Sequence, residues 1–269
     1  MQADNLEVVY ADFIARMRDP RARPLLAMIR SFINQFQGFT PGEQPLRYAA
    51  FMEALVAKAR TLSCLDYGAK AAGAGKDKDV VQTGDDTATE DLKSNNQHAD
   101  TDTDTRLEMC FEYLLTNQLA DAAMAGIMQS AGMAEREDQL TVKMLQFGWV
   151  EPGMIGYEDE CTDADQDNNR ANTRESISLA VQELDLLAKY RTPRDKKTIL
   201  LNAVRLVLGG LRADTNADDL LPCLICAVMR ARPSRLLTSL KYIQLYGRVY
   251  PDEQYLFTTC LAAISFIDQ

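Results

Sequence analysis

Two adjacent carboxylates, Asp218 and Asp219, directly precede an apolar run that could form a helix. The large aliphatic residues of this run recur every three or four positions, at Leu221, Leu224, Ile225 and Val228. That spacing predicts an amphipathic helix with one buried face. A helix start carries partial positive charge, so acidic side chains there act as caps or present a carboxylate to a partner. The segment by itself favours the cap.

Pro222 stands close to the expected start of this helix. Proline is tolerated in a first turn, because the N–H groups there have no partner within the helix. We therefore predict that the helix begins at Asp218 or Asp219 and that both carboxylates lie at its positive end.

A second amphipathic helix is predicted over residues 255–267. Tyr255 and Thr258 are three residues apart and therefore lie next to each other on one helix face. Most of the nearby apolar residues belong to the buried side: Leu256, Phe257, Cys260, Leu261 and Ile264. Two interpretations remain open: a polar edge of an amphipathic helix, or a contact site that works together with the aspartates.

Three short motifs, in this order along the chain, resemble those of the Vps-nine domain family: Thr192-Pro-Arg-Asp-Lys196, Ala217-Asp-Asp-Leu-Leu-Pro222 and Tyr255-Leu-Phe-Thr258. Each motif is weak alone, but three in the right order are a specific signal. The family is the catalytic module of exchange factors for early-endosomal Rab GTPases. The resemblance covers about the second half of the chain. Residues 21–66 are more faintly similar to the helical bundle that precedes the domain in Rabex-like proteins.

The resemblance implies a guanine nucleotide exchange factor that promotes GDP release from a small GTPase of the early-endosomal Rab five class, in endocytic vesicle trafficking. Asp218 is implied as an acidic finger that competes for the phosphate and Mg²⁺ site of the GTPase. Tyr255 and Thr258 are implied to hold this carboxylate and the switch region. An apolar groove between the two helices is implied to receive the GTPase, lined by Leu221, Pro222, Ile225 and Phe257. The resemblance implies that Asp219 is a helix cap. It implies nucleotide exchange without covalent chemistry, so we do not expect an enzyme that makes or breaks covalent bonds.

Two other functions stay open. One is a non-catalytic helical adaptor that binds a Rab GTPase without exchange activity, and the other is a scaffold whose resemblance is accidental. The presence of all three polar residues, Asp218, Tyr255 and Thr258, favours the exchange factor. The chain departs from the family at Arg232-Pro233-Ser234, where Asn-Pro-Pro is usual, and it stops at Gln269, where many members carry a further helix.

The net charge of −10 arises from two acidic segments, residues 68–105 and 156–172, each with a net charge of −5. The remainder is nearly neutral and has no clustered basic face, which argues against nucleic-acid binding. No stretch has the character of a signal peptide or a membrane span. We therefore expect a cytoplasmic protein that does not insert into membranes, and the resemblance implies that it is recruited peripherally to early endosomes.

No metal or cofactor site is expected. The only histidine, His98, lies in the first acidic segment, and the six scattered cysteines are typical of a reducing compartment. Cys223 and Cys226 have metal-type spacing, but no second pair or histidine completes four ligands. Their place in an apolar helix indicates core packing.

The predicted fold class is all-α, with helices packed in layers, because the long segments have helical spacing and none alternates as a strand. Residues 1–67 are predicted as part of a helical bundle and 106–269 as the Vps-nine-type domain. Between them, 68–105 has almost no large apolar residue and is predicted to be a disordered insertion. Residues 156–172 are predicted to be an acidic loop. Helices are expected at 24–36, 46–62, 107–119, 140–147, 176–190 and 196–208.

Overall fold

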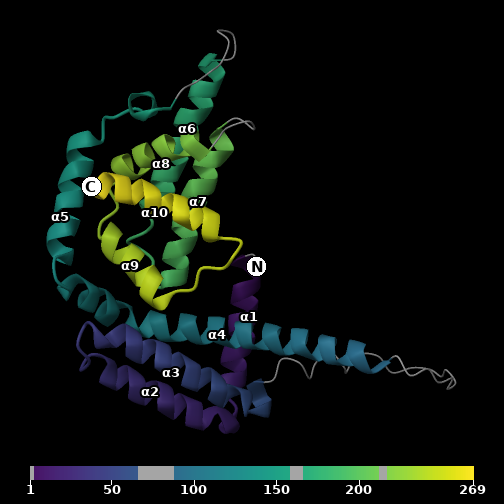
Figure 1. The fold of residues 1–269 in the computed structure, drawn as a ribbon. Helices are drawn as coiled ribbons and strands as arrows, with labels where there is room; N and C mark the ends of the chain where they lie inside the picture. The colour runs from purple at the N-terminus through teal and green to yellow at the C-terminus, as the bar shows by residue number, and fades with distance from the viewer. Residues whose placement is uncertain (1–2, 66–87, 158–165, 212–216) are drawn as a thin grey trace. The chain divides into compact units, whose positions relative to one another are not determined.

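The structure, a computed structural model, describes residues 3–65, 88–157, 166–211 and 217–269. Over these ranges the chain forms ten α-helices and three short 3-10 helices, η1 to η3, and no β-strand (Figure 1). The predicted all-α fold class is therefore confirmed. Among the described residues, no helix is long and apolar enough to cross a membrane.

The chain divides into two compact units, and the main boundary between them lies inside one helix, α4 (Ala88–Gln129). The first unit comprises Met1–Phe39 and Leu46–Gln118, and the second comprises Thr40–Pro45 and Leu119–Gln269. The sequence predicted the second domain to begin at residue 106. A boundary inside a continuous helix leaves no turn or linker signal in the sequence.

The first unit contains α1 (Ala3–Met17), α2 (Arg23–Phe36), most of α3 (Glu43–Arg60) and the N-terminal part of α4. Aromatic pairs form much of its core. Phe13 of α1 meets Phe111 of α4 edge-on at 5.0 Å between ring centroids, and Phe32 of α2 stacks on Phe51 of α3 at 4.0 Å. These contacts bury large apolar areas and add the preferred aromatic geometries.

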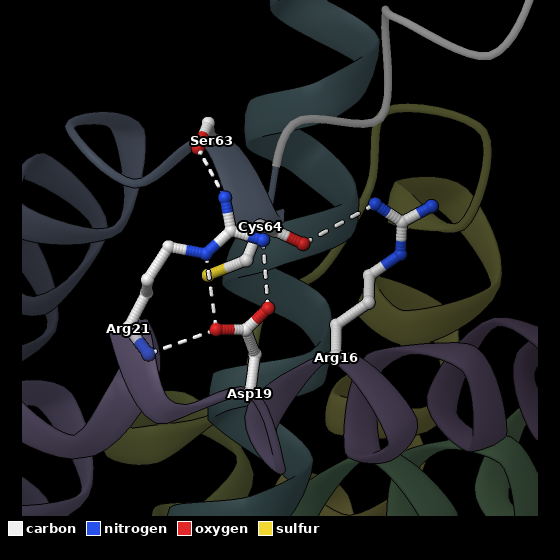
Figure 2. A network of polar contacts seen from close by, with 5 residues as sticks. All are labelled: Arg16, Asp19, Arg21, Ser63 and Cys64. Carbon is white, nitrogen blue, oxygen red and sulfur yellow. Dashed lines mark hydrogen bonds and ion pairs between the residues drawn. The ribbon is translucent and has the colours of Figure 1, made fainter.

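A polar network closes the turn between α1 and η1 (Pro20–Ala22) against η2 (Ser63–Leu65) (Figure 2). Asp19 caps η1 by accepting from the backbone N–H of Arg21 at 2.8 Å. The Arg21 guanidinium binds the same carboxylate and donates to Ser63 Oγ at 3.0 Å, while Arg16 donates to the carbonyl of Cys64 at 3.4 Å. The Arg21 guanidinium and backbone lower the pKa of Asp19 to about 2.

Helix α4 extends into the segment predicted as a disordered insertion. Residues 68–87 lie outside the described residues, but the helix begins at Ala88 and thus includes 88–105. No proline or glycine occurs between residues 85 and 125, so nothing in the backbone chemistry stops a helix there. Because extending a helix costs far less than nucleating one, the buried turns around Phe111 allow it to continue into polar sequence.

The second unit contains the C-terminal end of α4, six further helices and η3 (Pro152–Ile155). The helices are α5 (Met133–Phe147), α6 (Gln166–Leu184), α7 (Pro193–Gly210), α8 (Ala217–Ala231), α9 (Leu236–Tyr246) and α10 (Gln254–Asp268). Helix α7 contacts α6, α8, α9 and α10, and α10 also packs on α5 and α8 (Figure 1). Buried residues occur on several faces of α7, so it is the central helix of this unit.

The structure corrects two predicted boundaries around α6. The helix begins at Gln166 and ends at Leu184, whereas residues 176–190 were predicted. The acidic segment 156–172 was predicted to be a loop, but residues 166–172 belong to α6; residues 158–165 lie outside the described residues. Polar composition was misleading here, because Thr173 and Ile177 are buried and anchor the first half of the helix.

Helix α9 receives its cap from another helix. Its preceding residue, Arg235, has a left-handed backbone and makes no side-chain cap. Instead Glu137 of α5, itself buried, accepts from the backbone N–H groups of Leu237 and Thr238 at 3.2 and 2.9 Å and from the Thr238 hydroxyl at 2.7 Å. A buried carboxylate is tolerated at this place because three donors and a helix start surround it.

Helices α6 and α7 approach each other closely at Gly210. A Cβ at this position would lie 2.2 Å from both Cβ and Oγ of Ser176 and 3.0 Å from the carbonyl oxygen of Asn172. The Cβ of Ser176 cannot rotate away, so a larger residue requires the two helices to separate. Gly209, one residue earlier, faces open space.

We predict opposite effects from two neighbouring substitutions. Gly210→Ala should lower the free energy of unfolding by about 1–3 kcal/mol, because it overpacks the contact between α6 and α7. Gly209→Ala should leave it unchanged or raise it by up to about 1 kcal/mol, because alanine has the higher helix propensity. Urea unfolding of both variants measures the two changes in the free energy of unfolding, and equal changes would contradict the close approach of α6 and α7 at Gly210.

Candidate functional site

The two aspartates lie inside the first turn of α8. The helix begins at Ala217, one or two residues before the predicted start, so neither Asp218 nor Asp219 is the residue that precedes the helix. Asp219 is half-buried, and the side chain of Asp218 lies outside the described residues. Both carboxylates therefore belong to the turn where the free N–H groups of a helix give partial positive charge.

Pro222 is the sixth residue of α8 rather than a first-turn residue. Its side chain is buried against the unit. Since proline has no N–H, the usual helical hydrogen bond to the carbonyl of Asp218 is not made. The backbone at Asp218 is thus held less firmly by the helix than the backbone that follows.

Helix α10 presents Tyr255 and Thr258 to solvent. Tyr255 is 56% exposed and Thr258 is also exposed, while Phe257 and Cys260 between and beyond them are buried. The predicted polar edge is therefore present on α10. Because α10 packs directly on α8, the turn that carries the aspartates and the helix that carries Tyr255 belong to one packed pair.

The four residues predicted to line a groove lie mostly in the core. Ile225 and Phe257 are only 3% and 4% exposed, Pro222 is buried, and Leu221 alone of these four is half-buried. Ile225 and Phe257 are therefore core residues in this structure. Their direct contact with a GTPase remains a prediction, and Leu221 is the member that solvent reaches.

The first motif, at residues 192–196, forms the start of α7. Thr192 Oγ1 accepts from the backbone N–H of Asp195 at 3.1 Å and donates to the Asp195 carboxylate at 2.7 Å. Pro193 is the first residue of the helix, as its fixed φ favours. Asp195 therefore helps to tie the N-terminus of α7, and the helix includes residues 193–195, which were predicted to precede it.

Two lysines in this turn are buried, which the sequence analysis did not anticipate. Lys196 Nζ donates to the carbonyl of Leu187 at 2.7 Å, just after α6. Lys197 Nζ donates to the carbonyl of Arg248 at 2.6 Å and to Glu253 Oε2 at 2.5 Å, just before α10. The sequence contained a signal for the burial of Lys197, because this residue lies on the same helix face as the buried apolar residues Leu200, Val204 and Val207.

Three arginines lie at and just after the C-terminal end of α8. Arg230 pairs with Glu151 at 2.9 Å and donates to the carbonyl of Val150 at 3.3 Å. Arg232 and Arg235 adopt left-handed backbones, with φ of 49° and 55°, on either side of Pro233 and Ser234. Asn adopts this conformation more readily than Arg, which gives a physical reason for the family's usual Asn-Pro-Pro at this point.

Cys223 and Cys226 are buried, and burial raises the pKa of the Cys223 thiol to about 12 and of the Cys226 thiol to about 11. Thiols with raised pKa values are poor nucleophiles and poor metal ligands, so core packing is confirmed for them. In the described ranges, no three Cys, His, Asp or Glu side chains gather as metal ligands would. A hollow of ≈ 230 Å³ lies between η3 and α6, and none of the predicted site residues lines it.

The fold and the site define an all-helical domain in which an acidic helix start and an exposed tyrosine–threonine edge lie on two packed helices. Comparison with known proteins identifies its class: residues 177–269 match the family model described as the Vacuolar sorting protein 9 (VPS9) domain. The resemblance inferred from the three motifs is thereby confirmed over residues 177–269.

Several curated proteins are similar over longer stretches. The Vacuolar protein sorting-associated protein vps901 of Schizosaccharomyces pombe is 25% identical over 168 residues, which are 60% of this chain and 28% of the relative. The Rab5 GDP/GTP exchange factor of Homo sapiens is 26% identical over 144 residues, 50% of this chain and 28% of the relative. The Vacuolar protein sorting-associated protein 9A of Oryza sativa subsp. japonica is 37% identical over 100 residues, 33% of this chain and 21% of the relative. The matches thus cover less than a third of these relatives.

The buried position of Lys196 predicts a measurable dependence of stability on pH. Burial, together with the nearby Arg235, lowers the pKa of Lys196 to about 8. Between that pKa and the ordinary value of roughly 10.4, the unfolded chain holds a proton that the folded chain has released, so this group makes stability rise with pH. Below the pKa that Lys196 has in the folded chain, both states hold the proton, and burial of the charged ammonium lowers the free energy of unfolding to the full extent.

We therefore expect wild type to gain about 1–2 kcal/mol relative to Lys196→Met between about pH 7 and about pH 9.5. Urea unfolding of both proteins at the two pH values measures the change, and taking the difference cancels the titration of other groups. Lys189→Met, at an exposed position, is the matched control and should show no such change. A difference between wild type and Lys196→Met that does not vary with pH would contradict the prediction.

Proposed function

We propose that this chain is a guanine nucleotide exchange factor for a small GTPase of the early-endosomal Rab class. The observation that carries the proposal is the packed pair of α8 and α10 within the VPS9 domain, with an acidic first turn on one helix and exposed Tyr255 and Thr258 on the other. The name of the human relative, Rab5 GDP/GTP exchange factor, supports the choice of partner.

Exchange requires differential binding rather than bond making. The GTPase holds its nucleotide through Mg²⁺ and a lysine on the phosphates. A protein that binds the nucleotide-free state more tightly than the loaded state lowers the affinity for nucleotide by the same factor. Each factor of ten corresponds to about 1.4 kcal/mol of such coupling.

Asp218 is the residue that we propose to act on the phosphate and Mg²⁺ site. A carboxylate brought there competes for the lysine and repels the phosphates. Its place in the first turn of α8, at the end of the helix, is where a side chain can extend toward a partner. The missing helical hydrogen bond at the Asp218 carbonyl leaves this turn freer to adjust when the GTPase docks.

Tyr255 and Thr258 are proposed to contact the switch region and to orient the carboxylate of Asp218. Both are exposed on a helix that Phe257, Cys260 and Ile264 anchor in the core. The exposed groups can therefore make contacts without the helix having to move. Leu221 is proposed to supply the accessible apolar contact, with Ile225 and Phe257 beneath it.

The test is release of fluorescent GDP from a panel of purified Rab GTPases, with and without this chain. Acceleration of release from at least one of them is expected. Binding to a nucleotide-free Rab without acceleration would instead indicate the non-catalytic adaptor. Absence of both binding and acceleration would indicate a helical scaffold, and the proposal would be lost.

We predict that Asp218→Asn lowers the exchange rate at least ~tenfold, equivalent to about 1.4 kcal/mol of lost differential stabilisation. The substitution keeps the shape of the side chain and an acceptor oxygen and removes only its charge, so the melting temperature should change little. Asp219→Asn, one residue along the same turn, is the matched control and should largely retain exchange. If Asp218→Asn exchanges as fast as wild type, charge at this position is not the active element.

A polar contact on α10 is tested in the same assay. Thr258→Val should slow GDP release, whereas Ser265→Ala, at another exposed position two turns further along α10, should not. Equal effects of the two substitutions would contradict a specific role for Thr258.

A further inference from the structure

Lys197 connects the central helix α7 to the segment that leads into α10. Its side chain is only 3% exposed, and its ammonium donates at once to the carbonyl of Arg248 and to the carboxylate of Glu253. The ring of Tyr250 lies 4.9 Å from Nζ, as in a cation–π contact. One buried charge therefore holds both ends of residues 248–253.

Glu253 has a second part in this arrangement. Its Oε2 also accepts from the backbone N–H of Tyr250 at 3.0 Å, and Glu253 is the residue immediately before α10. Its carbonyl accepts from the N–H of Phe257 at 3.0 Å, in the first turn of the helix. The start of α10 is thus fixed by hydrogen bonds that lead back to Lys197.

We infer that Lys197 is a positioning residue for nucleotide exchange: through Glu253 it sets where α10 begins, and so how Tyr255 and Thr258 are presented beside the first turn of α8. The inference rests on the proposed function. Lys197 itself is buried and would not touch the GTPase.

Directional bonds are needed because apolar burial alone does not fix a helix register. Phe257, Cys260 and Ile264 hold α10 in the core, but hydrophobic contact is non-directional. Hydrogen bonds, by contrast, weaken steeply when their geometry changes. A shift of one residue along α10 moves each side chain by about 1.5 Å and turns it by about 100°. Tyr255 lies two residues after Glu253, so it depends directly on this anchor.

The decisive variant removes both partners together. Replacing Lys197 alone leaves the Glu253 carboxylate without its buried cation, so Lys197→Met alone would mix unfolding with mispositioning. In the double variant Lys197→Met with Glu253→Met no charge is stranded, the apolar core gains two flexible side chains, and the directional bonds are gone. Far-UV circular dichroism and thermal unfolding identify the temperature at which it is folded.

Two further variants serve as controls. Glu253→Gln keeps an acceptor oxygen for both Lys197 and Tyr250, so it should retain exchange within about threefold of wild type. Arg136→Met removes an exposed ion pair to Asp268 at the opposite end of α10, and it should leave exchange unchanged.

The double variant is expected to lower the saturating rate of GDP release at least ~tenfold while the Rab concentration at half-maximal rate changes less than about threefold, because misplaced groups act mainly on the exchange step. In the absence of the GTPase, the backbone amides of residues 254–258 should exchange hydrogen at least ~tenfold faster in the double variant than in wild type, while those of α6 should exchange at the same rate. A general loss of structure would instead affect both helices.

Two outcomes overturn the inference: a folded double variant that releases GDP within about threefold of wild type, or unchanged hydrogen exchange over residues 254–258. If wild type accelerates release from no Rab, the proposed function fails on its own. The role of Lys197 in fixing α10 is then decided by hydrogen exchange alone, where faster exchange supports it and unchanged exchange rejects it.

Discussion

The burial of two lysines near the start of α7, Lys196 and Lys197, is the constraint on which the second unit depends. An ammonium removed from water must be given acceptors, because an unpaired buried charge is costly. Lys196 finds one at the end of α6, and Lys197 finds two before α10. The central helix thereby ties its neighbours at defined points, and Thr192 closes the same turn with its own cap.

In this unit, the start of α9 and two buried ammonium groups find their partners outside their own helix. Glu137 of α5 caps α9 from about a hundred residues away, and Lys196 and Lys197 bind carbonyls outside their own helix. Such bonds are made only when the helices are already packed. They therefore couple local helix starts to the complete fold, and each substitution at these positions acts on more than one helix.

The proposed site combines a firmly held helix with a less firmly held turn. Helix α10 is anchored by buried apolar residues and by the bonds that lead to Lys197, so Tyr255 and Thr258 stand on a rigid support. The first turn of α8 lacks the helical bond that Pro222 cannot donate. A rigid contact surface beside an adjustable acidic turn suits a protein that must bind one state of its partner better than another.

Residue spacing and local chemistry predicted the all-α class, the burial of Cys223 and Cys226, and the polar edge at Tyr255 and Thr258. These features depend on periodicity and on bonds within one turn, which a sequence displays directly. Tertiary structure alone decided that α6 begins at Gln166, that Glu137 and Lys196 are buried with partners, and which distant atoms Lys197 binds. Their roles arise from contacts between residues far apart in the chain, and no local pattern specifies which distant atoms will meet.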